Sequence, residues 1–259
     1  MDRLAPTPIL GMKKSVRIEM AQKIGRKLIC DPKSLLNYLA VSFFGIIDSH
    51  FNSAWPRISP VQGWLAKREA YLLFKVARTS VPGSSIVEIG SYKGRSTIAL
   101  ANGVQAGVQI FAIDPHTGDK TEVEAGQLID TFTEFLSNVQ EYDSIVPIRN
   151  LSVNAVQEVR KRTQNVDILF IDGWHSEEAV NEDINSWIPL CSNQFTIIFD
   201  DWHQCEVSRG IIKNLEKLPP VIGIVGKDLV FSNHDELRAK ILFKIMHWTT
   251  SREVLNTFR

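Results

Sequence analysis

From residue 84 onward, short apolar runs alternate with segments whose apolar residues recur at helical spacing. The runs 85–90, 108–114, 144–149, 166–172 and 195–201 have the length of buried strands. Helical spacing marks the segments between them, including 124–139 with Leu128 on its apolar face and 206–218, and is clearest at Val180, Ile184, Trp187 and Ile188. Two last runs flank Gly226 and Lys227 and predict a hairpin. Repeated strand–helix units predict an α/β fold, with a mostly parallel sheet covered by helices on both faces.

The first 62 residues follow a different pattern. Residues 13–33 contain seven Lys and Arg, and residues 35–47 form an apolar run shorter than the roughly 20 residues of a membrane span. We interpret the basic run as a solvated helix face, an interfacial membrane helix being the less favoured alternative. The apolar run predicts a buried helix, and Pro56 and Pro60 predict a linker.

These patterns divide the chain into three parts. Residues 1–62 are expected to form a helical extension that caps the core or makes a contact between copies in a homo-oligomer. Residues 63–232 are expected to form the core domain, and residues 233–259 an amphipathic terminal helix.

Composition narrows the function classes. The chain has 259 residues, 29 Lys and Arg against 29 Asp and Glu, and 44% hydrophobic residues. Zero net charge argues against electrostatic binding of nucleic acid by the protein as a whole, and the hydrophobic content argues against disorder. Three widely separated cysteines form no C-x-x-C pair, so we expect no cysteine zinc site and a reducing, cytoplasmic location.

The strand ends carry the candidate chemistry. In a parallel sheet the carboxyl ends of the strands meet at one edge, and ligands bind there near the switch in strand order. Here that edge collects Gly90, Asp114, Asp172, Asp200 and Asp201. We therefore predict a ligand site at this edge.

The first motif is V-E-I-G-S-Y-K-G-R-S-T at residues 87–97. A strand feeds a turn in which Gly90 and Gly94 let the backbone approach a ligand, although neither a dinucleotide G-x-G-x-x-G nor a Walker loop is present. Glu88 suits a cationic or hydroxyl-rich ligand. Asp114, 24 positions after Gly90, suits the hydroxyls of a ribose. The alternative is an ordinary turn and a solvated strand-end carboxylate.

The second motif pairs I-D-G-W-H at 171–175 with F-D-D-W at 199–202. Asp172, Asp200 and Asp201 would repel one another unless they are protonated or bridged by a cation, and Mg²⁺ or another divalent cation suits such ligands. His175 could accept the proton of a hydroxyl. The alternative is that these residues cap helices and solvate loops.

With these motifs, residues 63–232 resemble the class I S-adenosylmethionine-dependent methyltransferases. They look most like the small metal-dependent O-methyltransferases that include macrolide sugar and mycobacterial methylmannose enzymes. Two departures are Tyr92, where the wider class has a second glycine, and Asp200, where some relatives have Glu. The resemblance implies a Rossmann-like sheet of seven strands, the last of them antiparallel.

The resemblance also implies roles for individual residues. Glu88, Gly90 and Ser91 would line the methionine end of the cofactor, Asp114 would hold the ribose, and Ser152 would lie near the adenine. The metal would be held by Asp172, Asp200 and Asp201, with His175 as the base. The implied cofactor-binding residues are Gly63, Trp64, Glu88, Gly90, Ser91, Gly94, Ser96, Asp114, Ser152 and Asp172.

The expected function is therefore methyl transfer from S-adenosylmethionine to a hydroxyl of a small, sugar-containing acceptor, assisted by a divalent metal. The sequence does not identify the acceptor, because residues 1–62 and the loops carry no specific signature. Two alternatives remain. One is a nicotinamide-dependent enzyme, against which the missing G-x-G-x-x-G counts, and the other is a non-catalytic or membrane-peripheral protein with the same fold.

Overall fold

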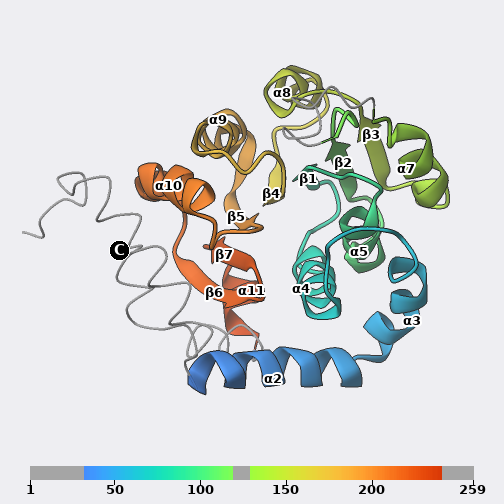
Figure 1. Cartoon of the computed structure of the whole chain (residues 1–259), viewed down its shortest axis with the longest axis vertical. Helices are drawn as coiled ribbons and strands as arrows, with labels where there is room; N and C mark the ends of the chain where they lie inside the picture. The colour runs from blue at the N-terminus through green and yellow to red at the C-terminus, as the bar shows by residue number, and fades with distance from the viewer. Residues whose placement is uncertain (1–31, 119–128, 241–259) are drawn as a thin grey trace, which may run out of the picture.

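The computed structural model describes residues 32–118 and 129–240, which are built around one seven-stranded sheet (Figure 1). In sheet order β3-β2-β1-β4-β5-β7-β6, β1 to β5 are parallel and β7 is antiparallel to both of its neighbours. The predicted Rossmann-like sheet with an antiparallel last strand is confirmed. Its strands are β1 (Ser85–Ile89), β2 (Gln109–Ile113), β3 (Ile145–Ile148), β4 (Val166–Ile171), β5 (Cys191–Phe199), β6 (Val221–Val225) and β7 (Asp228–Ser232).

The central strands β1 and β4 are buried along their whole length because both of their faces are covered. Ile86 and Phe170 point into one apolar core, whereas their chain neighbours Val87 and Leu169 point into the other. The first core is filled from α4 (Lys67–Ala77), α5 (Arg95–Gly103) and α7 (Phe132–Val139). The second is filled from α8 (Ser152–Arg160), α9 (Glu177–Trp187) and α10 (Cys205–Lys213).

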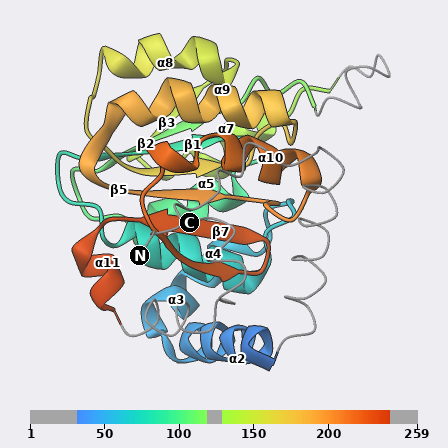
Figure 2. The ribbon, with the colours of Figure 1, turned by 90° about the vertical axis from the view of Figure 1, so that its left-hand side faces the viewer.

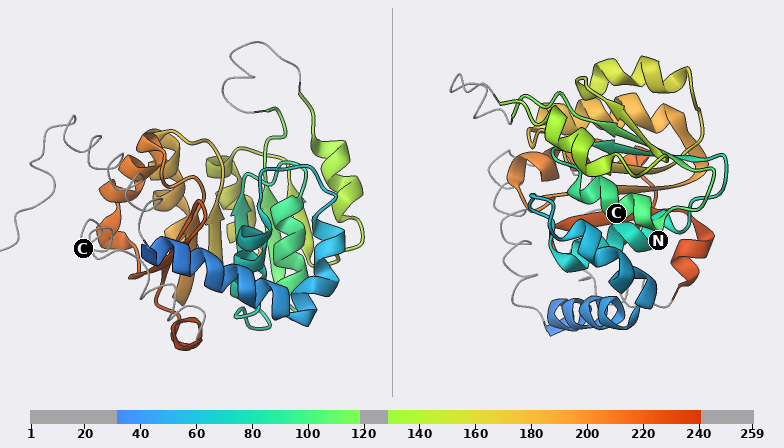
Figure 3. Two further views of the ribbon diagram at one scale, coloured as in Figure 1. Left: turned by 60° about the horizontal axis from the view of Figure 1, so that its bottom comes forward. Right: turned by 90° about the vertical axis from the view of Figure 1, so that its right-hand side faces the viewer.

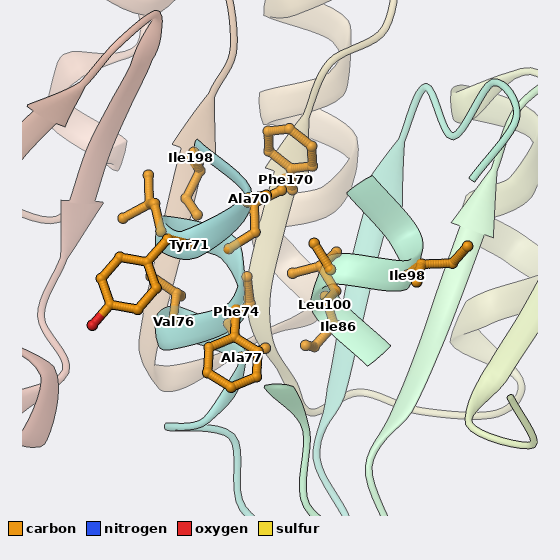
Figure 4. Close-up of a cluster of buried hydrophobic side chains, with 14 of the residues drawn as sticks. Ala70, Tyr71, Phe74, Val76, Ala77, Ile86, Ile98, Leu100, Phe170 and Ile198 are labelled. Atoms are coloured by element: carbon orange, nitrogen blue, oxygen red, sulfur yellow. The ribbon is translucent and has the colours of Figure 1, made fainter. Parts of the chain in front are cut away.

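The figures show these layers directly. In Figure 2, α8 and α9 lie above the sheet and α4 below it. In Figure 4, Ala70 and Phe74 of α4 gather with Ile86, Phe170 and Ile198 from the strands. A short helix, α11 (Asp235–Ala239), follows β7.

The N-terminal helices α2 (Pro32–Ile47) and α3 (Ser49–Ile58) form an additional layer outside α4 and α5 (Figure 3). The linker predicted from Pro56 is wrong, because α3 continues through that residue. Asp48 caps the helix by accepting from the Phe51 amide at 3.2 Å, and Phe51, Ala54 and Ile58 bury one side. Since Pro56 lies in the last turn, its missing N–H removes only one backbone bond.

Two other predicted helices differ in length. The segment 124–139 was expected to be helical throughout, but α7 begins at Phe132, and Leu128 lies outside the described residues. The segment 206–218 ends as an α-helix at Lys213 and continues as a 3₁₀ turn at Leu215–Lys217.

The predicted helix at 35–47 is present, but the expectation that it is buried is only half right, since one side of α2 is exposed. The basic residues before Lys33 and the segment 241–259 lie outside the described residues, so the three-part division of the chain stays a prediction. Within the described ranges, no helix has the length and hydropathy needed to cross a membrane.

One glycine fixes how closely β1 approaches β4. Gly90 has φ +89°, and a β-carbon added to it would lie 1.9 Å from the backbone oxygen of Asp172. Gly83 has nearly the same φ of +87°, but no atom lies within 4 Å of its added β-carbon. The two positions therefore separate the effect of backbone strain from that of a steric clash.

We expect Gly83→Ala to lower the free energy of unfolding by about 1–2 kcal/mol, the usual cost of a left-handed conformation for a residue with a β-carbon. Gly90→Ala should lower it by at least twice as much, because the clash with Asp172 is added to the same strain. Urea denaturation of both variants measures this difference. Equal losses would show that the close approach at Gly90 is not rigid.

Candidate functional site

The strand register places the predicted site residues side by side. Ile89 pairs with Ile113 on one side and with Ile171 on the other, and Ile171 pairs with Phe199. The residues that follow these four strand ends are Gly90, Asp114, Asp172 and Asp200. They therefore form a row along one edge of the sheet, across the switch in strand order between β1 and β4.

Backbone strain is found at this same edge. Tyr92, His116 and Asp201 have positive φ values of 44°, 59° and 48°, and each follows one of the strands that end there. Positive φ is unfavourable for residues with a β-carbon, and it persists where the surrounding structure imposes it. The turns after β1, β2 and β5 are thus held in defined conformations.

The Asp114 carboxylate connects two of these turns. Its Oδ2 accepts from the Tyr92 amide at 2.8 Å, and its Oδ1 accepts from the His116 amide at 2.6 Å. The buried His116 ring makes a hydrogen bond with the Thr131 hydroxyl at 2.9 Å, and burial lowers the pKa of this histidine. The backbone thus fixes the position of a carboxylate at the edge, where it could accept from ligand hydroxyls.

Buried polar groups lie beneath the glycine turn. Glu88 is fully buried, its Oε2 accepts from the Thr97 hydroxyl at 2.5 Å, and burial raises its pKa to about 7. Ser96 is also buried and contributes a hydrogen bond that opposes this rise. Glu88 Oε1 and the Ser91 hydroxyl have no hydrogen-bond partner among the described residues. Because buried polar atoms are nearly always paired, these two are suited to a ligand that brings hydrogen-bond donors.

The start of α5 and the segment before α4 meet at the same turn. Gly94 precedes α5 with φ +91°, which places Arg95 at the first helical position. The Arg95 guanidinium donates to the backbone oxygens of Val61 and Gly63 at 3.3 and 3.1 Å. Beside it, the Trp64 ring lies 5.4 Å from the Tyr92 ring and is 78% exposed. Gly63 and Trp64 thus lie beside the glycine turn, and their binding of the cofactor stays a prediction.

Ser152 lies at the start of α8, where its hydroxyl is engaged inside the protein. It donates to the Asp183 carboxyl and accepts from Trp187 Nε1 at 2.8 Å. Burial raises the pKa of Asp183 to about 7. These contacts join α8 to α9, and the predicted position of Ser152 near an adenine stays a prediction.

His175 lies between two carboxylates. Its Nε2 is 3.5 Å from Asp172 Oδ1, and its Nδ1 is 3.8 Å from Asp201 Oδ2. Burial raises the pKa of Asp172 well above its ordinary value, and the neighbouring Asp200 carboxylate raises it further. Its Nε2 has no hydrogen-bond partner among the described residues, so this nitrogen could accept a proton from a group at the edge.

Two charged residues of this region were not identified from the sequence. Lys227, in the turn between β6 and β7, donates to Asp200 Oδ2 at 2.5 Å and lies 3.8 Å from Asp201 Oδ1. Burial lowers the pKa of Lys227, but its interactions with Asp200, Asp172 and Asp201 outweigh this effect, so the pKa lies above its ordinary value. Asp228 is fully buried, and burial followed by the neighbouring Asp200 raises its pKa.

The arrangement does not fit the divalent cation predicted from the sequence. Within the described ranges, no three His, Cys, Asp or Glu side chains are arranged to hold a metal ion. The positive charge facing Asp200 and Asp201 is the Lys227 ammonium. Beside two of the three predicted ligands, Lys227 thus supplies the positive charge that the sequence analysis assigned to a cation.

Comparisons with known proteins agree with the fold and the motif. Residues 87–202 match a family described as "Methyltransferase domain". The O-methyltransferase NovP is similar in structure, with a TM-score of 0.53 and 14% identity over 86% of this chain and 100% of that chain. TomG from Streptomyces achromogenes is an O-methyltransferase involved in tomaymycin synthesis and was solved with SAM. Its structure is similar with a TM-score of 0.53 and 16% identity, over 78% of this chain and 99% of that chain. An O-methyltransferase from Bacillus cereus, solved with SAH, is similar with a TM-score of 0.50 and 15% identity, over 73% of this chain and 94% of that chain.

Proposed function

We propose that the chain, in which residues 87–202 match a methyltransferase domain, is a class I, S-adenosylmethionine-dependent enzyme that methylates a hydroxyl of a small, sugar-containing molecule. The observation that carries the proposal is the row formed by Gly90, Asp114, Asp172 and Asp200, with His175 beside it. It combines a turn for close ligand approach, a fixed carboxylate for hydroxyls and a proton acceptor at one edge.

The cofactor side of the proposal rests on two features. The orphaned Glu88 Oε1 and Ser91 hydroxyl lie where an ammonium group could donate to them, which suits the amino-acid end of S-adenosylmethionine. Asp114, fixed by two backbone amides, suits the ribose diol. Gly90 keeps the turn free of a side chain between these two positions.

The acceptor side is supported by exposed aromatic rings. Trp174 lies two residues after Asp172 and is 42% exposed, and Trp64 is exposed beside the glycine turn. Flat, partly apolar indole faces can pack against the C–H face of a sugar ring while the sugar hydroxyls stay in water. The sugar class is also the one implied by the resemblance in the motifs.

The chain's own residues account for the reaction as follows. When bound, S-adenosylmethionine supplies an electrophilic methyl carbon whose bond to sulfur breaks as the bond to the acceptor oxygen forms. His175 accepts the hydroxyl proton at a ring nitrogen, and the Asp201 carboxylate, 3.8 Å from Nδ1, interacts favourably with the charge it acquires. Since sulfonium is a good leaving group, the remaining task of the protein is to align the two reactants.

Assistance by Mg²⁺ bound to Asp172, Asp200 and Asp201 stays a prediction of the sequence, and no step above depends on it. The side-chain arrangement supports Lys227 as the positive charge of this region. Lys227 holds Asp200 at the edge and limits the repulsion between neighbouring carboxylates. The enzyme should then work without a divalent cation.

The cofactor assignment is tested by Asp114→Ala. The variant removes charge-assisted hydrogen bonds worth about 1.5–3 kcal/mol, so S-adenosylmethionine should bind at least tenfold more weakly. Calorimetric titration measures the affinity for S-adenosylmethionine, and circular dichroism checks that the variant folds. The control is Glu158→Ala, which removes a carboxylate from an exposed ion pair with Arg162. Unchanged affinity would refute the assignment, and wild-type protein that binds only NADH would refute the proposed function.

The base is tested by His175→Ala. Turnover should fall by about 10² to 10⁴, the usual contribution of a general base, while affinity for S-adenosylmethionine stays within twofold. The loss should shrink as the pH rises, because more of the acceptor hydroxyl ionises without help. His203→Ala is the matched control, since its ring is half exposed and 3.9 Å from Asp201. Equal losses in the two variants would mean that His175 does not act as the base.

The role of Lys227 is tested by removing either the metal or the ammonium group. Wild-type protein freed of metal with EDTA should keep its turnover and show no bound Mn²⁺ by electron paramagnetic resonance. Lys227→Met, which keeps most of the side-chain volume, should lose at least tenfold in turnover and begin to bind Mn²⁺, because the carboxylates lose their counter-charge. If EDTA abolishes wild-type turnover and Mg²⁺ restores it, the sequence-based metal prediction is right.

A further inference from the structure

The outer half of α2 is apolar. At 100° per residue, its large exposed side chains spread over about half of the helix circumference, and the polar residue within that arc is the partly buried Ser42. Each of these side chains is between 44% and 66% exposed. They are Leu35, Leu36, Tyr38, Leu39, Phe43, Ile46 and Ile47. Exposed apolar surface of this extent on one helix marks an interaction site.

The inner half of α2 fixes the rotation of the helix. The Asn37 side chain donates to the backbone oxygen of Ile224 in β6, and Val41 is buried in the core. Gly45 packs against the Tyr71 ring. Because these contacts hold the helix from one side, the exposed apolar side chains lie on its other side. The helix itself lies at the outside of the fold (Figures 2 and 3).

Charge identifies the partner. No charged residue occurs from 34 to 47, whereas residues 13–33, which lead into α2, contain seven Lys and Arg against two acidic residues. An apolar helix face that follows a net positive segment in the sequence matches an anionic lipid surface, where each basic residue near the membrane contributes about 1 kcal/mol. A second copy of the chain covering the same face would instead bring two positive segments together, which is unfavourable.

The dimensions of the helix agree with this partner. With 16 residues, α2 is about 24 Å long, shorter than the roughly 30 Å hydrocarbon core of a bilayer. Such a helix lies in the plane of the interface, with one face in the lipid and the other on the protein. We propose that α2 is a docking face for anionic membrane surfaces. This proposal does not depend on the proposed methyl transfer.

Co-sedimentation of the full chain with lipid vesicles tests the proposal. The wild-type chain should pellet with phosphatidylglycerol vesicles, at least tenfold less with phosphatidylcholine vesicles, and less in 0.5 M salt, where charges are screened. The double variant Leu39→Glu/Phe43→Glu should bind phosphatidylglycerol vesicles at least tenfold more weakly, because two carboxylates then enter the apolar arc. Val81→Glu is the matched control, since Val81 is also half exposed but lies outside α2.

If a second copy of the chain covers α2, or if the basic residues alone bind lipid, the same measurements give different results. Circular dichroism should show that the variants fold, and light scattering should show whether their size changes. The proposal is overturned if the wild-type chain does not pellet with either kind of vesicle. If that chain is also a dimer that the double variant converts to a monomer, a second copy covers α2. Vesicle binding that the double variant retains in full also overturns it, because the basic residues would then bind lipid without α2.

Discussion

Repulsion between carboxylates is the constraint that this sheet edge has to satisfy. Asp172, Asp200 and Asp228 follow or begin neighbouring strands β4, β5 and β7, so the register itself brings them together. Two unit charges about 4 Å apart near a protein surface interact by about 4 kcal/mol. Raised pKa values at Asp172 and Asp228 relieve part of this repulsion, and Lys227, on the turn beside Asp228, relieves another part. The arrangement of the edge therefore depends on the β6–β7 hairpin.

The features that the sequence predicts well are those encoded by short, local patterns. A buried parallel strand is a continuous apolar run, so the carboxyl ends of the strands could be located within a residue or two. The start of β5 was missed, because this strand begins at Cys191, four residues before the predicted run. Once five strands share a direction, their carboxyl ends must share an edge, and the proximity of Gly90, Asp114, Asp172 and Asp200 follows. The glycine turn was predicted for the same reason, because positive φ at Gly90 and Gly94 is read from residue type.

The features that the sequence does not predict depend on contacts between distant segments. Lys227 was recognised as a turn residue, but its partner Asp200 is 27 positions away, and only the sheet order joins them. Knowing that a hairpin turn after a strand parallel to β5 reaches the same edge could have identified this lysine. Pro56 was assigned to a linker because its own propensity was weighed above the burial of Phe51 and Ile58 on the same helix. The exposed half of α2 was missed because hydrophobicity alone does not separate a helix in a core from one on a surface.

The position of β7 between β5 and β6 has a consequence for biosynthesis. Chains grow from the N-terminus, so the outer edge of β5 stays unpaired until residues 221–232 have been made. At about 5–20 residues per second, the 33 positions from Phe199 to Ser232 correspond to about 2–7 seconds. During this interval the nascent sheet has an open strand edge, and its carboxylates have no lysine beside them. The chain is then most prone to pair with another nascent chain, and closure of the hairpin ends both conditions at once.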